Sequence, residues 1–253
     1  VSNVLNVAST QAISFQWYSN TVNSNTGGLL LSGETGTSFT PSSAVAGIKY
    51  YYCVIGNGTV QIPSNVVSVR VEQSPTLSGV SQQSAVCGGQ NATILLTGLV
   101  SGSVNKVYYH IGSSGVLLAD SVLETGGGNG SFLFMTTNAN NGQNLVIDSI
   151  KSSCTSNFSY SLTLAVNTSP SNATGGSTVT GCTVGTLTLS VSDPGAGFTT
   201  NWYAAATGGS VLSGGSGTNS YVTPSFSNDT TVTYYAQTYS ATTGCSSPSR
   251  VAV

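Results

Sequence analysis

The residues that could carry acid–base or metal chemistry are few in this sequence of 253 residues. There is one histidine, His110, and there are seven acidic residues, none of them in an Asp-x-Asp cluster. His110 has no Cys, His or Glu at the spacing of a metal site or a catalytic triad. Because acid–base catalysis needs several such groups in position, we predict that the chain is not an enzyme. We also predict no metal or cofactor, and a His110 that is exposed or hydrogen-bonded.

The five cysteines indicate disulfide chemistry in an oxidising compartment. Cys87 and Cys154 flank the middle third of the chain, and Cys182 and Cys245 flank the last third. We therefore predict two bridges, Cys87–Cys154 and Cys182–Cys245, each worth roughly 4 kcal/mol in the chain-entropy model. Cys53 has no obvious partner, so it is either a buried unpaired thiol or a cysteine whose partner lies outside this sequence.

A repeated pattern indicates how the chain positions these residues. Gln-Trp-Tyr at 16–18 is followed about thirty residues later by a tyrosine run at 50–52, and Asn-Trp-Tyr at 201–203 is followed at a similar distance by tyrosines at 234–235. Between these motifs, residues 26–37 match residues 207–218 without a gap. Such a match is the mark of an internal duplication.

The repeat spacing and the turn residues predict an all-β protein. The two tryptophans lie 185 positions apart, which favours units of about 90 residues. We predict tandem immunoglobulin-like β-sandwich domains at 1–72, 73–168 and 169–253, arranged as a rod by short proline-containing linkers. Trp17, Tyr51, Trp202 and Tyr235 are the predicted core anchors.

Composition excludes several classes of partner. Charged residues make up 5% of the chain and the net charge is −2, so there is no basic cluster to hold nucleic acid or an anionic membrane. No apolar run is long enough to insert into a bilayer. The glycine-rich stretch at 126–130 is followed by a predicted strand rather than a helix, so we interpret it as a turn and not as a phosphate-binding loop.

The motifs resemble a known family. Trp-Tyr-Ala-Ala-Ala-Thr-Gly-Gly at 202–209 and its sister motif at 16–37 are similar to the immunoglobulin-like repeats of very large secreted surface proteins of Bacteroidetes. The middle unit resembles the Cys-flanked repeats that alternate with them. The resemblance implies a secreted cell-surface adhesin of the gliding-motility type, exported by the type IX secretion system, of which this chain is a fragment. Its implied partners are neighbouring repeats, surface polysaccharide and outer-membrane secretion or motility machinery.

The same resemblance implies O-glycans. Proteins of that phylum carry them at Asp-Ser or Asp-Thr followed by a small or aliphatic residue, which predicts modification of Ser121, Ser149 and Thr230.

Three functions remain open at this point. The first is a structural and adhesive stalk at the cell surface. The second is a polysaccharide-binding module, for which Tyr221 and Tyr239 are the candidate aromatic contacts. The third is an accessory β-region of a secreted hydrolase.

Overall fold

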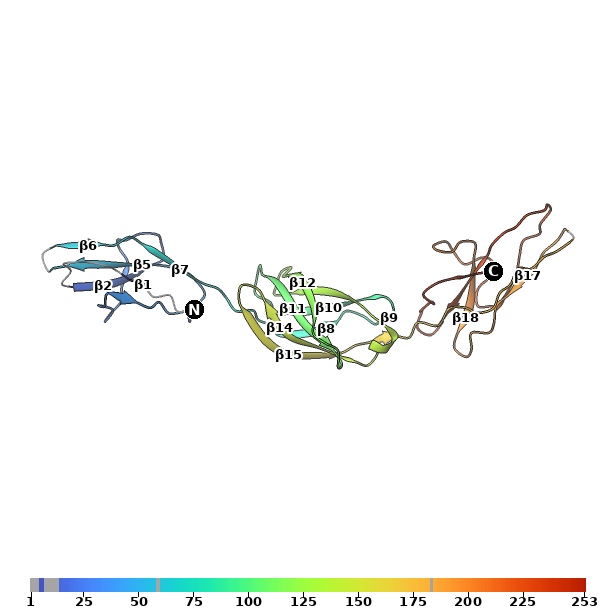
Figure 1. The fold of residues 1–253 in the computed structure, drawn as a ribbon, viewed down its shortest axis with the longest axis horizontal. Helices are drawn as coiled ribbons and strands as arrows, with labels where there is room; N and C mark the ends of the chain where they lie inside the picture. Colours follow the sequence, from blue (N-terminus) through green and yellow to red (C-terminus); the bar gives the residue numbers. More distant parts are fainter. Residues whose placement is uncertain (1–4, 7–13, 58–59, 183) are drawn as a thin grey trace. The chain divides into compact units, whose positions relative to one another are not determined.

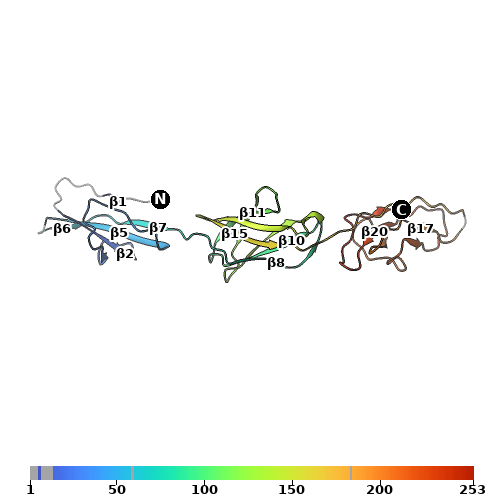
Figure 2. The ribbon, with the colours of Figure 1, turned by 90° about the horizontal axis from the view of Figure 1, so that it is seen from below.

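The computed structural model describes residues 5–6, 14–57, 60–182 and 184–253. These residues form short β-strands and one 3-10 turn, η1 (Asn138–Asn140), with no α-helix among them (Figures 1 and 2). The predicted fold class is confirmed, because the chain consists of tandem immunoglobulin-like β-sandwiches. Among the described residues, no helix is long and apolar enough to cross a bilayer.

The chain divides into two compact units. The first comprises residues 1–76 with 151–156, and the second comprises residues 77–150 with 157–253. The second unit has two separate hydrophobic cores, one within residues 77–166 and one within residues 173–253. We call the three sandwiches one, two and three in chain order. The domain boundaries at 72/73 and 168/169 stay a prediction.

Sandwich one pairs β1 (Leu5–Asn6) with β4 (Ser38–Phe39). Its larger sheet has the order β3-β2-β5-β6, and β7 also pairs with β5. The strands of this sheet are β2 (Ser14–Asn20), β3 (Leu29–Leu30), β5 (Gly47–Gly56), β6 (Gln61–Pro63) and β7 (Val67–Val71).

Sandwich two has a sheet of order β13-β10-β8, a sheet of order β12-β11-β14-β15, and a parallel pair of β9 with β16. Its strands are β8 (Gly79–Gln82), β9 (Val86–Cys87), β10 (Asn91–Thr97), β11 (Val104–Ile111), β12 (Leu117–Leu123), β13 (Gly130–Met135), β14 (Asn144–Lys151), β15 (Thr155–Thr163) and β16 (Val166–Asn167).

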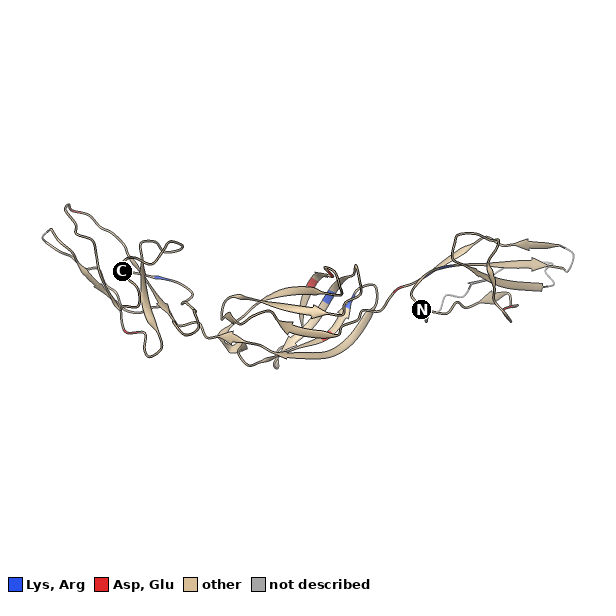
Figure 3. Cartoon of the chain, turned by 180° about the vertical axis from the view of Figure 1, so that it is seen from behind, with Lys and Arg blue, Asp and Glu red and all other residues tan. Residues whose placement is uncertain are grey.

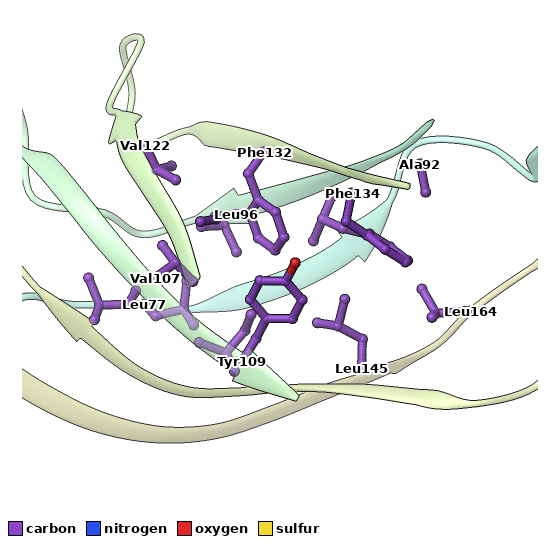
Figure 4. Packing of buried hydrophobic residues seen from close by; sticks show 14 of the residues in the cluster. Leu77, Ala92, Leu96, Val107, Tyr109, Val122, Phe132, Phe134, Leu145 and Leu164 are labelled. Carbon is purple, nitrogen blue, oxygen red and sulfur yellow. The ribbon is translucent and has the colours of Figure 1, made fainter. Parts of the chain in front are cut away.

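Strict alternation builds the core of sandwich two. In β10, Ala92, Ile94 and Leu96 are fully buried while the residues between them are less so, as expected for a strand with one face on the core. Figure 4 shows the ring of Tyr109 pointing at Phe132 from the opposite sheet, with ring centroids 4.9 Å apart. Such inward aromatics account for much of the area that the core removes from water.

Sandwich three repeats this plan with fewer strands. Its sheets have the orders β17-β19 and β18-β20-β21. The strands are β17 (Thr188–Ser190), β18 (Thr199–Tyr203), β19 (Ser220–Val222), β20 (Tyr235–Tyr239) and β21 (Val251–Ala252).

Sandwiches one and three share hydrogen bonds as well as sequence. Trp17 N donates to Glu34 O and Leu31 N donates to Trp17 O, each at 3.0 Å. The matching residues make the same bonds in sandwich three, where Trp202 N donates to Gly215 O and Leu212 N to Trp202 O, each at 2.8 Å. The gap-free match of 26–37 with 207–218 is therefore a match of backbone structure.

The aromatic contacts of the two cores also correspond. Phe39 lies between Trp17 and Tyr51, with ring centroids 5.7 and 5.3 Å away. Tyr221 lies in the same way between Trp202 and Tyr234, with centroids 5.8 and 5.3 Å away. Trp17, Tyr51 and Trp202 are all buried.

The predicted core anchor Tyr235 was wrong by one position. Tyr234 and Ala236 are buried, and Tyr235 points to the other face of β20, opposite Tyr203 in the register. A shift of one residue reverses the face on which a strand residue lies, so the counterpart of Tyr51 is Tyr234.

Candidate functional site

A disulfide joins the two sandwiches of the second unit. Cys87 ends β9 in sandwich two, and Cys245 lies in the turn between β20 and β21 of sandwich three. Their Cα atoms are 5.6 Å apart although the residues are 158 positions apart in the sequence. We call this disulfide, with the linker residues 167–172 beside it, the joint.

The predicted bridge Cys87–Cys154 was wrong, and Cys154 is a free thiol. Cys87 lies opposite Asn167, just beyond the C-terminal end of β15, whereas Cys154 precedes its N-terminal end. The nine residues of β15 span about 30 Å at about 3.3 Å each. Disulfide bonding requires Cα atoms to lie within about 7 Å, so this pair cannot form.

The predicted bridge Cys182–Cys245 was wrong for the same reason, and Cys182 is free and exposed. Cys182 lines a cavity together with Tyr234, which directly precedes β20. Cys245 lies beyond the other end of that strand, where Ser240 N donates to its carbonyl oxygen at 2.8 Å. The two cysteines are therefore at opposite ends of sandwich three.

Polar contacts fix the linker at the joint. The buried Ser169 donates from Oγ to Gly88 O at 2.7 Å and from N to Asn138 Oδ1 at 2.9 Å. Three positions later Asn172 Oδ1 accepts from Ser249 N, in sandwich three, at 3.1 Å. A Cβ at Gly88 would collide with Asn138 Oδ1, so this close approach requires glycine. The linker is thus hydrogen-bonded to both sandwiches.

The glycine-rich stretch wraps a carboxylate of its own chain. Glu124 Oε1 accepts from Gly126 N at 2.7 Å and from Gly128 N at 2.8 Å, and Oε2 accepts from Gly102 N at 2.9 Å. Donation from Gly102, then from Gly128 and Gly126, holds the pKa of Glu124 below its ordinary value, although burial acts in the opposite direction. The stretch is a structural loop organised by Glu124.

Glu124→Gln is expected to destabilise sandwich two at neutral pH, because an amide cannot accept from all three glycines without facing one with its own NH₂ group. A lowered pKa means that the ionised carboxylate stabilises the fold above the ordinary carboxyl value, and that this contribution is lost as the pH falls. Urea unfolding should therefore give the variant a lower midpoint at pH 7, and the gap should shrink in acid. The exposed Glu72→Gln is the control, and an unchanged midpoint at pH 7 would contradict this role.

Arg250 holds the repeated Thr-Gly-Gly loop in sandwich three. Its guanidinium lies 3.3 Å from the centroid of the Tyr203 ring. Nη1 donates to Ala205 O at 2.7 Å and to Gly208 O at 2.6 Å. Sandwich one holds the matching loop differently, by the Tyr52 hydroxyl accepting from Gly28 N at 3.1 Å.

Arg250→Lys is expected to destabilise sandwich three by about 1–2 kcal/mol. Lysine keeps the charge but loses the planar fork that stacks on a ring while it donates to two carbonyl oxygens. Amide hydrogen exchange in residues 203–209 should speed up, while exchange in residues 26–31 of the matching loop should stay unchanged. Equal exchange in the wild type and the variant would show that Arg250 does not hold the loop.

A small charged face lies on the outside of the sheet β12-β11-β14-β15. Charged residues are sparse, and several of them lie on sandwich two (Figure 3). Here His110 Nδ1 pairs with Asp148 Oδ1 at 2.8 Å, and Lys106 Nζ pairs with Asp120 Oδ2 at 3.1 Å. The hydrogen bond to Lys106 lowers the pKa of Asp120. His110 and Asp148 are 38 positions apart and belong to no shared motif, so this pair could not be predicted from residue spacing.

The described residues contain no group of three or more His, Cys, Asp or Glu side chains that could hold a metal ion. Cys53 is fully buried, and this burial raises the pKa of its thiol. It therefore stays protonated at neutral pH, which makes it a poor nucleophile.

The predicted contact and modification residues lie in different settings. Tyr221 is buried in the core of sandwich three, so it cannot bind a polysaccharide, and Tyr239 is half-buried. Ser121 and Thr230 are exposed and Ser149 is half-buried. Ser121 has a φ of 59°, at an irregularity in the pairing of β12 with β11. Glycosylation at the three positions stays a prediction.

Comparison with known proteins finds a family model that matches the last third of the chain. Residues 169–253 match the family model described as "Ig-like domain CHU_C associated". No curated protein matches the sequence.

Solved structures with tandem immunoglobulin domains are similar to the chain at low identity. Titin domains I67–I69, as an E-to-A mutated variant, have a TM-score of 0.44 at 12% identity, covering 97% of this chain and 91% of that one. The mouse nectin-like molecule 4 ectodomain has a TM-score of 0.36 at 12% identity, covering 100% and 92%. The four N-terminal domains of Dscam1 have a TM-score of 0.34 at 13% identity, covering 97% and 72%.

Proposed function

We propose that this chain is a structural segment of a stalk in a large secreted surface protein, and that it carries mechanical force. The observation that supports this proposal is the disulfide of the joint. Cys87 and Cys245 are 158 positions apart, so 157 residues lie between them. Force applied to the two ends of the chain is transmitted from Cys87 to Cys245 through the disulfide bond and not through the residues between them. The strands from β10 to β20 lie within the closed loop, so the pull does not pass along their backbone.

The finer proposal concerns the parent protein. The repeated Trp-Tyr motifs resemble those of Bacteroidetes surface adhesins, and residues 169–253 match a family of immunoglobulin-like domains. These two findings support a cell-surface adhesin exported by the type IX secretion system and used in gliding motility. Neighbouring repeats are then its main partners, and O-glycans at Ser121, Ser149 and Thr230 would add hydration to a surface that has few charges.

A stalk at a cell surface must also survive cleavage, and the joint predicts how. A protease site can be placed in the exposed loop at 113–116, between Cys87 and Cys245. After complete cleavage, the two pieces should migrate as one band on a denaturing gel without reductant, because the disulfide joins them. They should migrate as two bands once the disulfide is reduced. A matched site in the 22–27 turn of sandwich one, outside the closed loop, should release a fragment in both conditions. Separation of the first protein without reductant would contradict the proposal.

A further inference from the structure

Two free cysteines are not buried, Cys182 and Cys154, and they occupy the same topological positions as the bridged Cys87 and Cys245. The sheet orders β12-β11-β14-β15 and β18-β20-β21 make β14 equivalent to β20 and β15 to β21, and the pairs β10–β13 and β17–β19 correspond. Cys182 precedes β17 as Cys87 precedes β10. Cys154 lies in the β14–β15 turn as Cys245 lies in the β20–β21 turn.

A second observation shows where a partner of Cys182 would come from. In sandwich two, Cys87 lies opposite Asn167, where the chain leaves towards sandwich three. In sandwich three, Cys182 and Val253 line the same open cavity of about 520 Å³. The backbone repeats this arrangement, since Leu164 is hydrogen-bonded to Gly142 and Gln143 just before β14, and Val253 is hydrogen-bonded to Tyr234 just before β20. A sandwich joined after residue 253 would therefore begin beside Cys182, as sandwich three begins beside Cys87.

We propose that Cys182 forms a second disulfide between sandwiches, with the cysteine at the Cys245 position of a sandwich joined after residue 253. The two thiols react with a small-molecule disulfide, RSSR, by thiol–disulfide exchange. One S–S bond forms between the sandwiches, and two RSH molecules take up the protons and electrons. The exposure of Cys182 permits this exchange.

The disulfide of the joint would then be one member of a series in which each sandwich is bonded to the next. The second bridge follows from the positions of the cysteines and not from the mechanical role of the stalk, so the two proposals can fail separately. A series of this kind would extend the protection from force along every sandwich that carries both cysteines.

An extended chain tests the proposal directly. Residues 1–253 are followed by a second copy of residues 167–253, and the protein is folded with a mixture of reduced and oxidised glutathione. The original chain has three free cysteines, Cys53, Cys154 and Cys182. The extended chain has two more cysteines, and the proposal predicts that it still has three free ones. The second copy carries Thr→Ser at the exposed positions of Thr180 and Thr242, so that its cysteine peptides differ in mass from those of the first copy. Mass spectrometry of unreduced peptides should then join the unmarked Cys182 peptide to the marked peptide of the second Cys245 position.

The controls separate this bridge from other outcomes. Cys182→Ser in the first copy should leave the second Cys245 position free, whereas Cys154→Ser should leave the bridge intact. Five free cysteines, or a bridge inside the second copy, would overturn the proposal. The difference between the tryptophan fluorescence of the extended chain and that of residues 1–253 reports the burial of the third tryptophan, and with it the folding of the second copy. Independently, a bulky maleimide should label Cys182 in the native 253-residue chain but not the buried Cys53, and an unreactive Cys182 would overturn the proposal whatever the extended chain does.

Discussion

Pulled from its two ends, the oxidised chain is expected to unfold sandwich one and to leave most of sandwiches two and three intact. The disulfide closes a loop of 157 residues, and only β8, β9 and β21 of these two sandwiches lie outside it. A disulfide does not break at the forces that unfold β-sandwiches. Reduction, or Cys87→Ser, should therefore release an additional length of roughly 500 Å, at about 3.4 Å for each extended residue.

Single-molecule force spectroscopy measures this difference in contour length. The reduced chain should show further unfolding events for sandwiches two and three, since each has its own core. Cys182→Ser and Cys154→Ser remove free thiols only, so they should leave the oxidised pattern unchanged. If the oxidised wild type extended as far as Cys87→Ser, force would not pass through Cys87 and Cys245.

Trp202→Ala is expected to destabilise sandwich three by about 3–5 kcal/mol, which is a large part of the stability of a small domain. The indole is fully buried and packs on Tyr221, and its Nε1 donates to Thr218 O at 2.9 Å. Its removal leaves a cavity in the core and a carbonyl without its donor.

Hydrogen exchange resolved by mass spectrometry locates this loss. Peptides of residues 169–253 should exchange much faster in the variant, while peptides of sandwich two should change little because its core is separate. Val222→Ala is the matched control, since Val222 lies in the same sandwich with 57% of its surface exposed. A loss below about 1 kcal/mol would show that Trp202 is not the centre of this core.

The repeated motifs predicted the fold because identical turn residues set identical backbone bonds. The match of 26–37 with 207–218 places both tryptophans between the same donors and acceptors. The sequence spacing between Trp202 and the tyrosine pair predicted the correct strand but the wrong face of the sheet. Tyr234 and Tyr235 are adjacent, so their side chains lie on opposite faces, and only Tyr234 is buried.

The site was harder to predict because it depends on which strand ends meet. Cysteine spacing gives the order of the half-cystines along the chain but not the end of the sandwich at which each one lies. Cys87 and Cys154 flank one sandwich in sequence, yet the length of β15 separates them. The contacts of Arg250 with Ala205 and Gly208 likewise join segments more than forty positions apart that share no motif.

Mass mapping of unreduced peptides from the native 253-residue chain, with free thiols alkylated first, tests the central claim most directly. The account predicts one linked pair, Cys87 with Cys245, and alkylated Cys53, Cys154 and Cys182. Peptides that join Cys87 to Cys154 or Cys182 to Cys245 would place both bridges inside single sandwiches and contradict it.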